Sequence, residues 1–409
     1  MKKPELLAPA GNLEKLKAAI NFGADAVYLG GNKLNLTASA GNFSLDDLKE
    51  GIDFAHLRGK KVYVTVNIFP HNEDLVGLED YLTDIQNVGA DAIIAADPGI
   101  IATAKEVIPD MEIHLSTQAN CTNYKAALFW HSMGIKRLVV AREMSLNELT
   151  ELRSELPHAC EIEAFVHGSM CISYSGRCLL SNYMTGQDAN RGECAQPCRY
   201  KYHLVEEKRP GEYYNITQDG NGTYIMNSKD LCMIEYIPQL IEAGIGSFKI
   251  EGRMKSSFYV ASVVKAYREA IDLYTRDPAK YEFDPKWMEY LVKPSHRPFT
   301  TGFYFGEEIK QHYQSSSYIR DYDIIGIVMD YDEKSKTAVI EQRNKAFSGD
   351  SVEILTQKGD NKIIKLNDMR NQDGTQIDSA PNAKMIFTIQ CDMKLKNGDI
   401  IIKQNARSQ

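Results

Sequence analysis

The sequence lacks several features that would place the protein at a membrane or outside the cell. No apolar run approaches the roughly 20 residues that span a bilayer. The N-terminal segment MKKPELLAPAGN has two lysines but no apolar stretch after them, so it does not resemble a signal peptide. The net charge is −8 at pH 7, which argues against a broad basic surface for nucleic acids. We therefore expect a cytoplasmic globular protein that does not associate with membranes.

Common catalytic motifs are also missing. The sequence has no H-E-x-x-H pattern of zinc proteases and no G-x-S-x-G pattern of α/β-hydrolases. It has no G-x-G-x-x-G after the first predicted strand and no C-x-x-C redox pair. These absences argue against the best-known hydrolases, dinucleotide-binding enzymes and dithiol oxidoreductases.

One pattern recurs through the first 277 residues: an amphipathic helix, a glycine and a short apolar run, as in AAINFGADAVYLGG and LIEAGIGSFKIEG. Glycine suits the left-handed cap of a helix, and the apolar run suits a parallel strand that is buried on both faces. The strands predicted in this way are residues 6–9, 26–30, 62–67, 92–96, 113–117, 137–141, 162–166 and 247–250. Alternating strands and helices of this number predict an α/β fold, a (β/α)8 TIM-like barrel. An open doubly wound sheet is the alternative.

The domain organisation follows from where this pattern is interrupted. We predict the barrel over residues 1–277, with a long insertion at 168–231 after the seventh strand. Loops that follow barrel strands carry active sites, so the insertion is predicted to be functional. A connector rich in proline and aromatic residues covers 278–321. Short alternating strands at 322–409 predict a C-terminal antiparallel β-barrel or sandwich domain.

The insertion holds four of the eight cysteines, with the spacing Cys171-x6-Cys178-x15-Cys194-x3-Cys198. Thiols stay reduced in the cytoplasm, where clustered cysteines more often bind metals or catalyse reactions than form disulfides. The spacing matches neither a zinc ribbon nor the common ferredoxins, yet four soft thiolates in one segment suit an iron–sulfur cluster or a zinc ion.

The other four cysteines stand alone. Cys121, Cys160 and Cys391 lie in apolar or strand-like runs and are predicted to be buried core residues. Cys232, at the far end of the insertion, could either ligate a metal or pack under the following helix.

Long stretches of the sequence resemble a known family. The segments EAFVHGSMCISYSGRCLLSNYMTG, DANRGECAQPCRYKY, NGTYIMNSKDL, SFKIEGRMKSSFYVA and LLAPAGNLEKLKAAINFGADAVYLG are similar to those of the peptidase U32 family, the collagenase-like proteins. The resemblance covers essentially the whole chain and is strongest to the members that act in prephenate-dependent hydroxylation of tRNA. Those members convert the wobble uridine to 5-hydroxyuridine and depend on iron–sulfur assembly.

The resemblance implies a tRNA-modifying enzyme with a 4Fe-4S cluster on Cys171, Cys178, Cys194 and Cys198, although Cys232 remains an alternative fourth ligand. We expect that air can remove the cluster or that zinc can replace it. Prephenate is the implied co-substrate and tRNA the implied partner, with or without a related family subunit. The alternatives are a U32-type peptidase and an iron–sulfur hydroxylase subunit for rRNA or ubiquinone.

Prephenate is a dicarboxylate, and arginine forks are the side chains that bind carboxylates best. Arg142 follows the sixth predicted strand, Arg177 lies between two cysteines, and Arg253 follows the eighth strand. All three are predicted to contact substrate. Glu143 and Glu251 are predicted to orient these arginines.

Further candidates lie at or near predicted strand ends. His167 could act as a general acid or base, or donate a hydrogen bond to a cluster sulfur. Lys249 is predicted to face inward from the eighth strand. Asn67, Asp97 and Gln118 are predicted to read a base edge or to hold water.

Two segments of the insertion, KRPGEYY and CRYKYH, interleave tyrosines with basic residues. Stacking and phosphate pairing by such residues would suit an unpaired anticodon loop. The C-terminal domain is the other candidate for binding tRNA.

Overall fold

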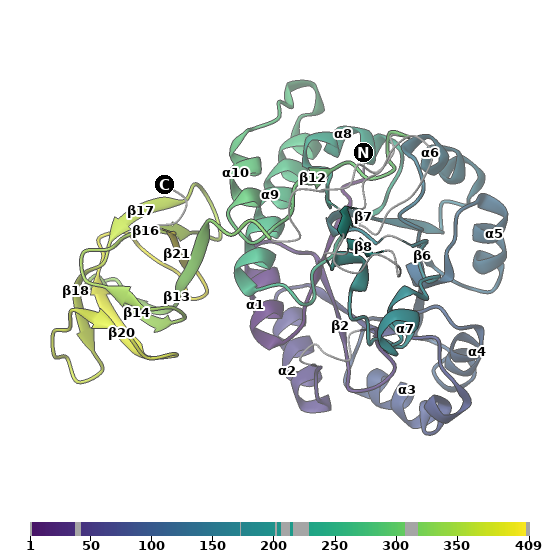
Figure 1. The fold of residues 1–409 in the computed structure, drawn as a ribbon, viewed down its shortest axis with the longest axis horizontal. Coiled ribbons are helices and arrows are strands. Elements are labelled where there is room, and N and C mark those ends of the chain that lie inside the picture. Colours follow the sequence, from purple (N-terminus) through teal and green to yellow (C-terminus); the bar gives the residue numbers. More distant parts are fainter. Residues whose placement is uncertain are drawn as a thin grey trace.

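The computed structural model describes residues 2–36, 42–171, 173–200, 203–205, 213–215, 229–306 and 318–405, with backbone alone for 203–205 and 213–215. Eight parallel strands close into a barrel (Figure 1), because β11 pairs with both β1 and β7. The barrel strands are β1 (Glu5–Pro9), β2 (Ala26–Gly30), β3 (Lys61–Val66), β4 (Ala92–Ala95), β5 (Glu112–Leu115), β6 (Arg137–Val139), β7 (Glu161–Ser169) and β11 (Ser247–Ile250). The predicted barrel fold and its eight strands are therefore confirmed.

Helices surround the barrel and follow the strands in turn. They are α1 (Leu13–Asn21), α2 (Leu45–His56), α3 (Leu78–Asn87), α4 (Pro98–Val107), α5 (Tyr124–Ser132), α6 (Leu146–Glu155), α8 (Ile237–Glu242) and α9 (Ser257–Arg276). The glycines of the recurring pattern have positive φ angles just after their helices, as predicted: Gly23, Gly89, Gly134 and Gly244. Side-chain caps such as Ser44 and Ser145 begin α2 and α6.

The seventh strand is longer than the sequence predicts and is irregular. β10 (Asp230–Cys232), which follows the insertion, pairs antiparallel with the end of β7, and β12 (Phe299–Thr300) pairs with β10. Between β7 and β11 the register shifts, so that Phe165 lies opposite Lys249 but His167 lies opposite Ile250. Such a bulge reverses the alternation of side chains on the two faces of a strand.

The insertion adds α7 (Leu180–Thr185) and a two-stranded pair, β8 (His203–Val205) with β9 (Tyr213–Asn215). Beyond α9 the chain forms the short helix α10 (Lys286–Val292) within the connector. Figure 1 draws α7 in front of the barrel strands.

The C-terminal domain is an antiparallel sheet of seven strands in the order β17-β16-β21-β13-β14-β20-β18, with a hydrophobic core of its own. Its strands are β13 (Tyr322–Asp332), β14 (Thr337–Gln342), β16 (Ser351–Leu355), β17 (Lys362–Lys365), β18 (Asn367–Asn371), β20 (Ile386–Gln390) and β21 (Ile400–Gln404), while β15 (Ala346–Phe347) and β19 (Ser379–Ala380) form a separate pair. The predicted C-terminal β domain is present.

The two domains meet along α1, α9 and α10, away from the open ends of the barrel. Lys265 of α9 donates hydrogen bonds to the carbonyl oxygens of Thr356 at 2.7 Å and Gly359 at 2.5 Å. Arg343 pairs with Glu14 at 2.6 Å. Among the described residues, no helix is long and apolar enough to cross a membrane.

Candidate active site

A pocket of about 290 Å³ lies at the end of the barrel where the carboxyl ends of the strands meet. From the barrel it is lined by side chains near strand ends, namely Tyr28, Thr65, Asn67, Ile94, Ser116, Thr117, Gln118, Arg142, Phe165, Lys249, Glu251 and Arg253. From the insertion it is lined by Cys171, Tyr174, Gly176, Cys178, Ala189, Asn190 and Cys194. This end of a TIM-like barrel is where catalysis takes place in such folds.

The cysteine segment is held against the pocket by specific contacts. The backbone N–H of Ser175 donates to a Glu143 carboxylate oxygen at 2.9 Å. Gly176 has a φ of +71°, and a Cβ there would lie 2.2 Å from the carbonyl oxygen of Gln118, so only glycine allows this approach. The Asn190 amide donates to the Cys178 carbonyl at 2.9 Å. Glu143 therefore positions the cysteine segment, and in this structure it does not line the pocket.

The four clustered cysteines are free thiols that influence one another electrostatically. Cys171 and Cys194 are exposed, and Cys178 and Cys198 are half-buried. Burial, with the negative charges of the other three thiolates, raises the pKa of Cys198 to about 11. Burial, with the charges of Cys171 and Cys178, also raises the pKa of Cys194. Such mutual repulsion is relieved when thiolates share a metal ion.

In their present side-chain conformations, the four thiols do not converge on one metal position. Over the described part of the chain, no group of three or more His, Cys, Asp or Glu side chains is close enough to hold a metal ion. The donor set itself, four soft sulfurs of which three line one pocket, fits an iron–sulfur cluster or zinc.

The remaining cysteines are buried. Cys121, Cys160 and Cys391 are core residues, as predicted from their apolar surroundings. Cys232 lies in β10 opposite His167, and burial raises the pKa of its thiol to about 12. Cys232 does not line the pocket.

Two arginines line the pocket without a carboxylate partner in the part of the chain that the structure describes. The Arg142 guanidinium lies 3.8 Å from the centre of the Phe165 ring. Arg253 is 5% exposed, and its terminal nitrogens lie 3.4 Å from the Thr65 hydroxyl and 3.3 Å from the Asn35 amide oxygen. Burial lowers the pKa of Arg253 to about 10, although the negative charge of Glu251, which lines the same pocket, opposes this shift.

Lys249 is the third cation of the pocket, and it has a carboxylate partner. Its ammonium lies 2.7 Å from the Glu163 carboxylate, which is fully buried inside the barrel. Glu163 is also 3.2 Å from the Arg137 guanidinium. Although burial alone would raise the pKa of Glu163, the charges of Lys249 and Arg137 hold that pKa below its ordinary value.

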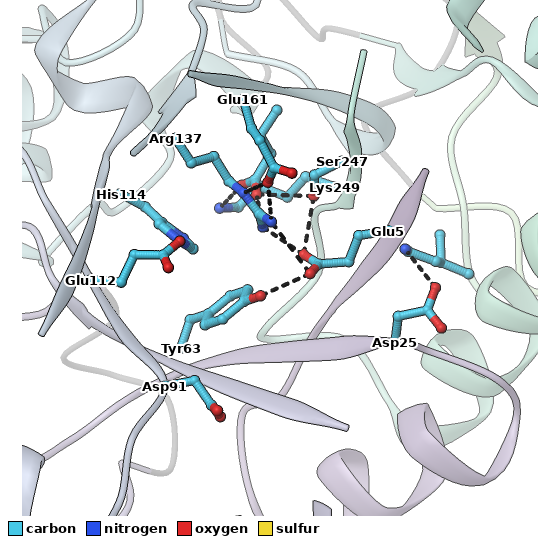
Figure 2. A network of polar contacts seen from close by, with 12 residues as sticks. Glu5, Asp25, Tyr63, Asp91, Glu112, His114, Arg137, Glu161, Ser247 and Lys249 are labelled. Atoms are coloured by element: carbon cyan, nitrogen blue, oxygen red, sulfur yellow. Dashed lines mark hydrogen bonds and ion pairs between the residues drawn. The ribbon is translucent and has the colours of Figure 1, made fainter. Parts of the chain in front are cut away.

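Arg137 continues this ion network toward the opposite end of the barrel. Figure 2 shows Arg137 between Glu161 and Glu5, which it contacts at 2.7 Å and 2.5 Å. The Tyr63 hydroxyl donates to Glu5 at 2.8 Å. A wider hollow of about 700 Å³ opens at that end, where Lys2, Glu5 and Arg137 are among its lining residues. Charge pairs at this end of a TIM-like barrel contribute to stability rather than to catalysis, since active sites lie at the other end.

Asn67 and Gln118 both reach the pocket, as their strand-end positions predicted. The Asn67 amide nitrogen donates to the Ser116 hydroxyl at 3.3 Å. The amide oxygen of Asn67 is buried and has no hydrogen-bond partner among the described residues. A ligand with an N–H or O–H group could satisfy this acceptor.

The structure places His167 outside the pocket. Because of the β7 bulge, its ring faces α9, where Nδ1 lies 3.4 Å from the Tyr267 hydroxyl and the ring packs near Tyr259 and Phe299. Burial, with the positive charge of Lys255 and that of His296, lowers the pKa of His167 to about 3. His167 is therefore neutral at neutral pH and buried within the protein.

Three further predicted residues have other contacts. Arg177 is exposed and does not line the pocket. Asp97 caps α4, because its carboxylate accepts the N–H groups of Gly99 at 2.8 Å and Ile100 at 3.0 Å. Glu251 lines the pocket, accepts the N–H of Ser169 at 3.3 Å, and acts electrostatically on Arg253 without forming a hydrogen bond to it within the described residues.

Sequence reasoning missed several pocket residues. Tyr28, Thr65 and Phe165 lie within strands, one or two positions before the ends that were searched. Glu163, which pairs with Lys249, is the one acidic residue of the predicted apolar run 162–166, and a charged residue in such a run was the signal that could have identified it. The basic and tyrosine-rich segments KRPGEYY and CRYKYH lie largely outside the residues whose side chains the structure describes.

Comparison with known proteins agrees with this architecture. Residues 11–314 match Peptidase family U32, and residues 320–401 match the Peptidase family U32 C-terminal domain. The chain belongs to peptidase family U32. The tRNA hydroxylation protein P1 of Bacillus subtilis is 43% identical over 404 residues, which cover 98% of this chain and 95% of that relative.

Other family members carry two kinds of name. The tRNA hydroxylation protein P of Escherichia coli is 38% identical, with 93% of this chain and 92% of that relative covered. A protein named collagenase from Porphyromonas gingivalis is 32% identical, with 99% of each chain covered. The U32 family therefore unites proteins named for tRNA hydroxylation and for proteolysis.

Proposed function

We propose that this U32 protein is a cytoplasmic tRNA-modifying enzyme that hydroxylates the wobble uridine to 5-hydroxyuridine, with prephenate as co-substrate and a 4Fe-4S cluster. The observation that carries the proposal is the pocket that unites three clustered cysteines with Arg142, Lys249 and Arg253. Several relatives that match most of the chain are named tRNA hydroxylation proteins, which supports the choice of substrate.

The cluster would be held by Cys171, Cys178, Cys194 and Cys198. Cys198 is favoured over Cys232 as the fourth ligand, because its thiol interacts electrostatically with the other three, whereas Cys232 lies in the core beside Tyr267. When bound, an iron–sulfur cluster supplies a path for electrons, with a potential set by burial and by hydrogen bonds to sulfur. Glu143 and Asn190 would keep the ligand segment against the pocket.

Prephenate would bind through its carboxylates to Arg142 and Arg253. Both guanidinium groups line the pocket, and neither forms an ion pair with a carboxylate in the described residues. Arg253 is buried and Arg142 is half-buried, so an anion that binds between them would recover part of the electrostatic free energy that burial of Arg253 has cost. Asn67, with its unpartnered amide oxygen, is the side chain proposed to accept a hydrogen bond from the base.

The experiment is complementation in a bacterial strain that makes no 5-hydroxyuridine-derived nucleosides. We expect the wild-type gene to restore these nucleosides in tRNA, as measured by nucleoside mass spectrometry. The protein purified without oxygen should be brown and should contain iron and sulfide. Unmodified tRNA despite soluble, iron-loaded protein would reject the proposed function.

Peptidase activity is the second candidate, because the family name and the Porphyromonas gingivalis relative point to it. It would predict cleavage of gelatin by colourless protein, and cleavage that survives Cys171→Ser with Cys178→Ser. A hydroxylase subunit for rRNA or ubiquinone is distinguished by the modified product. Mixing with a second U32 protein tests whether a partner subunit is needed.

A further inference from the structure

Lys249 differs from the other two cations of the pocket in what surrounds its nitrogen. It is the one lysine that lines the pocket within the described residues, and it is 4% exposed. Its ammonium is already compensated by Glu163 at 2.7 Å. The other oxygen of that carboxylate is held by Arg137 at 3.2 Å and Ser247 at 3.0 Å. Lys249 is therefore fixed in place, and its charge is already balanced by Glu163 rather than left for a bound anion.

The surroundings of Lys249 favour the chemistry of a free amine. Burial lowers the pKa of Lys249, and the positive charges of Arg137 and Arg142 act in the same direction, while Glu163 opposes them. Lysines that are desolvated beside other cations serve as nucleophiles toward carbonyl groups. Glu163 lies at hydrogen-bond distance and can accept the proton that the amine must release.

We propose that Lys249 forms an imine with the ketone of an anionic oxo acid bound in the pocket. The inference rests on the proposed function, because prephenate carries such a ketone next to one of its two carboxylates. The pocket offers a matching set of groups. Arg142 and Arg253 form no ion pair with a carboxylate within the described residues, and the Lys249 amine lies 2.7 Å from a buried carboxylate and 4.6 Å from the centre of the Tyr28 ring.

The step is balanced without an oxidant or reductant. The Lys249 ammonium passes a proton to Glu163, and the free amine attacks the carbonyl carbon to form a carbinolamine. The hydroxyl group leaves as water after Glu163 returns a proton, and a protonated imine remains. The sum is ammonium plus ketone giving iminium plus water. The iminium carries the positive charge that the ammonium had, so the Glu163 carboxylate stays compensated.

An imine would change the reactivity of the bound oxo acid. A protonated imine withdraws electrons more strongly than a ketone, so the hydrogens on the neighbouring carbon become more acidic. The fixed position of Lys249 on β11 would also hold the ketone at one place in the pocket.

Reductive trapping tests the inference. The full-length protein is incubated with prephenate and sodium cyanoborohydride, and the adduct is located by intact mass and peptide mapping. We expect one adduct per chain, on Lys249, and none in Lys249→Arg. Lys265 is the matched internal control, because it is also buried but donates to the Thr356 carbonyl outside the pocket, and it should stay unlabelled. Glu163→Gln should slow trapping at least ten-fold.

Prephenate binding, measured by calorimetry on the same wild-type protein, separates the two proposals. Binding without a Lys249 adduct would overturn the imine and leave the proposed function standing. An adduct spread over exposed lysines would overturn the imine as well. No binding of prephenate would overturn the proposed co-substrate and the imine with it. Because the decisive map is made on wild-type protein, the test does not depend on Glu163→Gln being stable.

Discussion

The two ends of the barrel carry similar charged side chains in opposite arrangements. Toward the N-terminal end, Arg137 contacts three carboxylates, those of Glu5, Glu161 and Glu163. At the C-terminal end, Arg142 faces an aromatic ring and Arg253 faces a hydroxyl and an amide oxygen. Charges that are paired when buried make a rigid structure, whereas buried charges left uncompensated cost free energy unless a ligand neutralises them. The first arrangement suits holding the barrel together, and the second suits the anion binding that we propose for the pocket.

We expect the largest effect on activity from substituting the clustered cysteines, which lie at the C-terminal end of the barrel. Cys171→Ser removes an exposed thiol and one proposed cluster ligand. We expect anaerobically purified protein to lose its iron and complementation to fall to background, while the urea midpoint stays unchanged. Cys391→Ala, which alters a buried cysteine of the C-terminal domain, is the control and should lower stability but keep iron and product. Full iron content in Cys171→Ser would contradict the assignment.

Disrupting the buried ion network around Glu163 should cause the largest loss of stability. Glu163→Gln leaves Lys249 and Arg137 without this buried carboxylate, and breaking a buried pair costs about 3–5 kcal/mol. Glu14→Gln breaks a partly exposed pair with Arg343 and should cost about 0–1 kcal/mol. Urea denaturation measures both. Equal losses would mean that the buried network does not hold the barrel together as described.

Substitutions of the arginines at the C-terminal end of the barrel should change ligand binding more than stability. Arg142→Met and Arg253→Met each remove a proposed partner of a prephenate carboxylate. We expect each to weaken prephenate binding by about ten-fold or more, since hydrogen bonds to charged groups contribute about 1.5–3 kcal/mol.

Arg177→Met provides the control for these binding measurements, because Arg177 is exposed and lies outside the pocket lining. Its affinity for prephenate should match that of the wild type. Equal weakening in all three variants would show that binding depends on general positive charge and not on the pocket.

The buried side chain of His167 should make the stability of the protein depend on pH. The pKa of His167 is lowered to about 3 in the folded protein from 6.5, so the unfolded chain binds the proton first as pH falls. His167 therefore makes stability fall as pH drops from about 6.5 toward 3, by at most about 1.4 kcal/mol per pH unit. The urea midpoint of His167→Gln should fall less between pH 7 and pH 4.5. His158→Gln, at an exposed position, is the control and should follow the wild type.

The sequence predicted the barrel well because its strands carry a local signal. Five of the eight apolar runs, those of β2, β3, β4, β6 and β11, follow a glycine with positive φ, and both features depend on neighbouring residues alone. The extension of β7 was not predicted, because its partner β10 lies on the far side of the insertion. The bulge in β7 was missed for the same reason, and it turned His167 from an expected pocket residue into a buried one.

The candidate site was predicted in part. Arg142, Lys249 and Arg253 were found because strand ends of a parallel barrel converge. Asp97 sits at a comparable position, yet its carboxylate is used by the first turn of α4. Position relative to a strand end therefore narrows the set of candidate site residues, but local hydrogen bonds decide which of these side chains remain available to a ligand.

By itself, the sequence determined the order of strands and helices, the long insertion and the set of four thiols, since these follow from local patterns and composition. Only the tertiary structure decided which charges are neutralised. Glu163, Arg137 and Lys249 are far apart in the chain, and their distances became fixed when β11 closed the ring between β1 and β7. Coulombic pairing depends on those distances across the barrel, which no local pattern encodes.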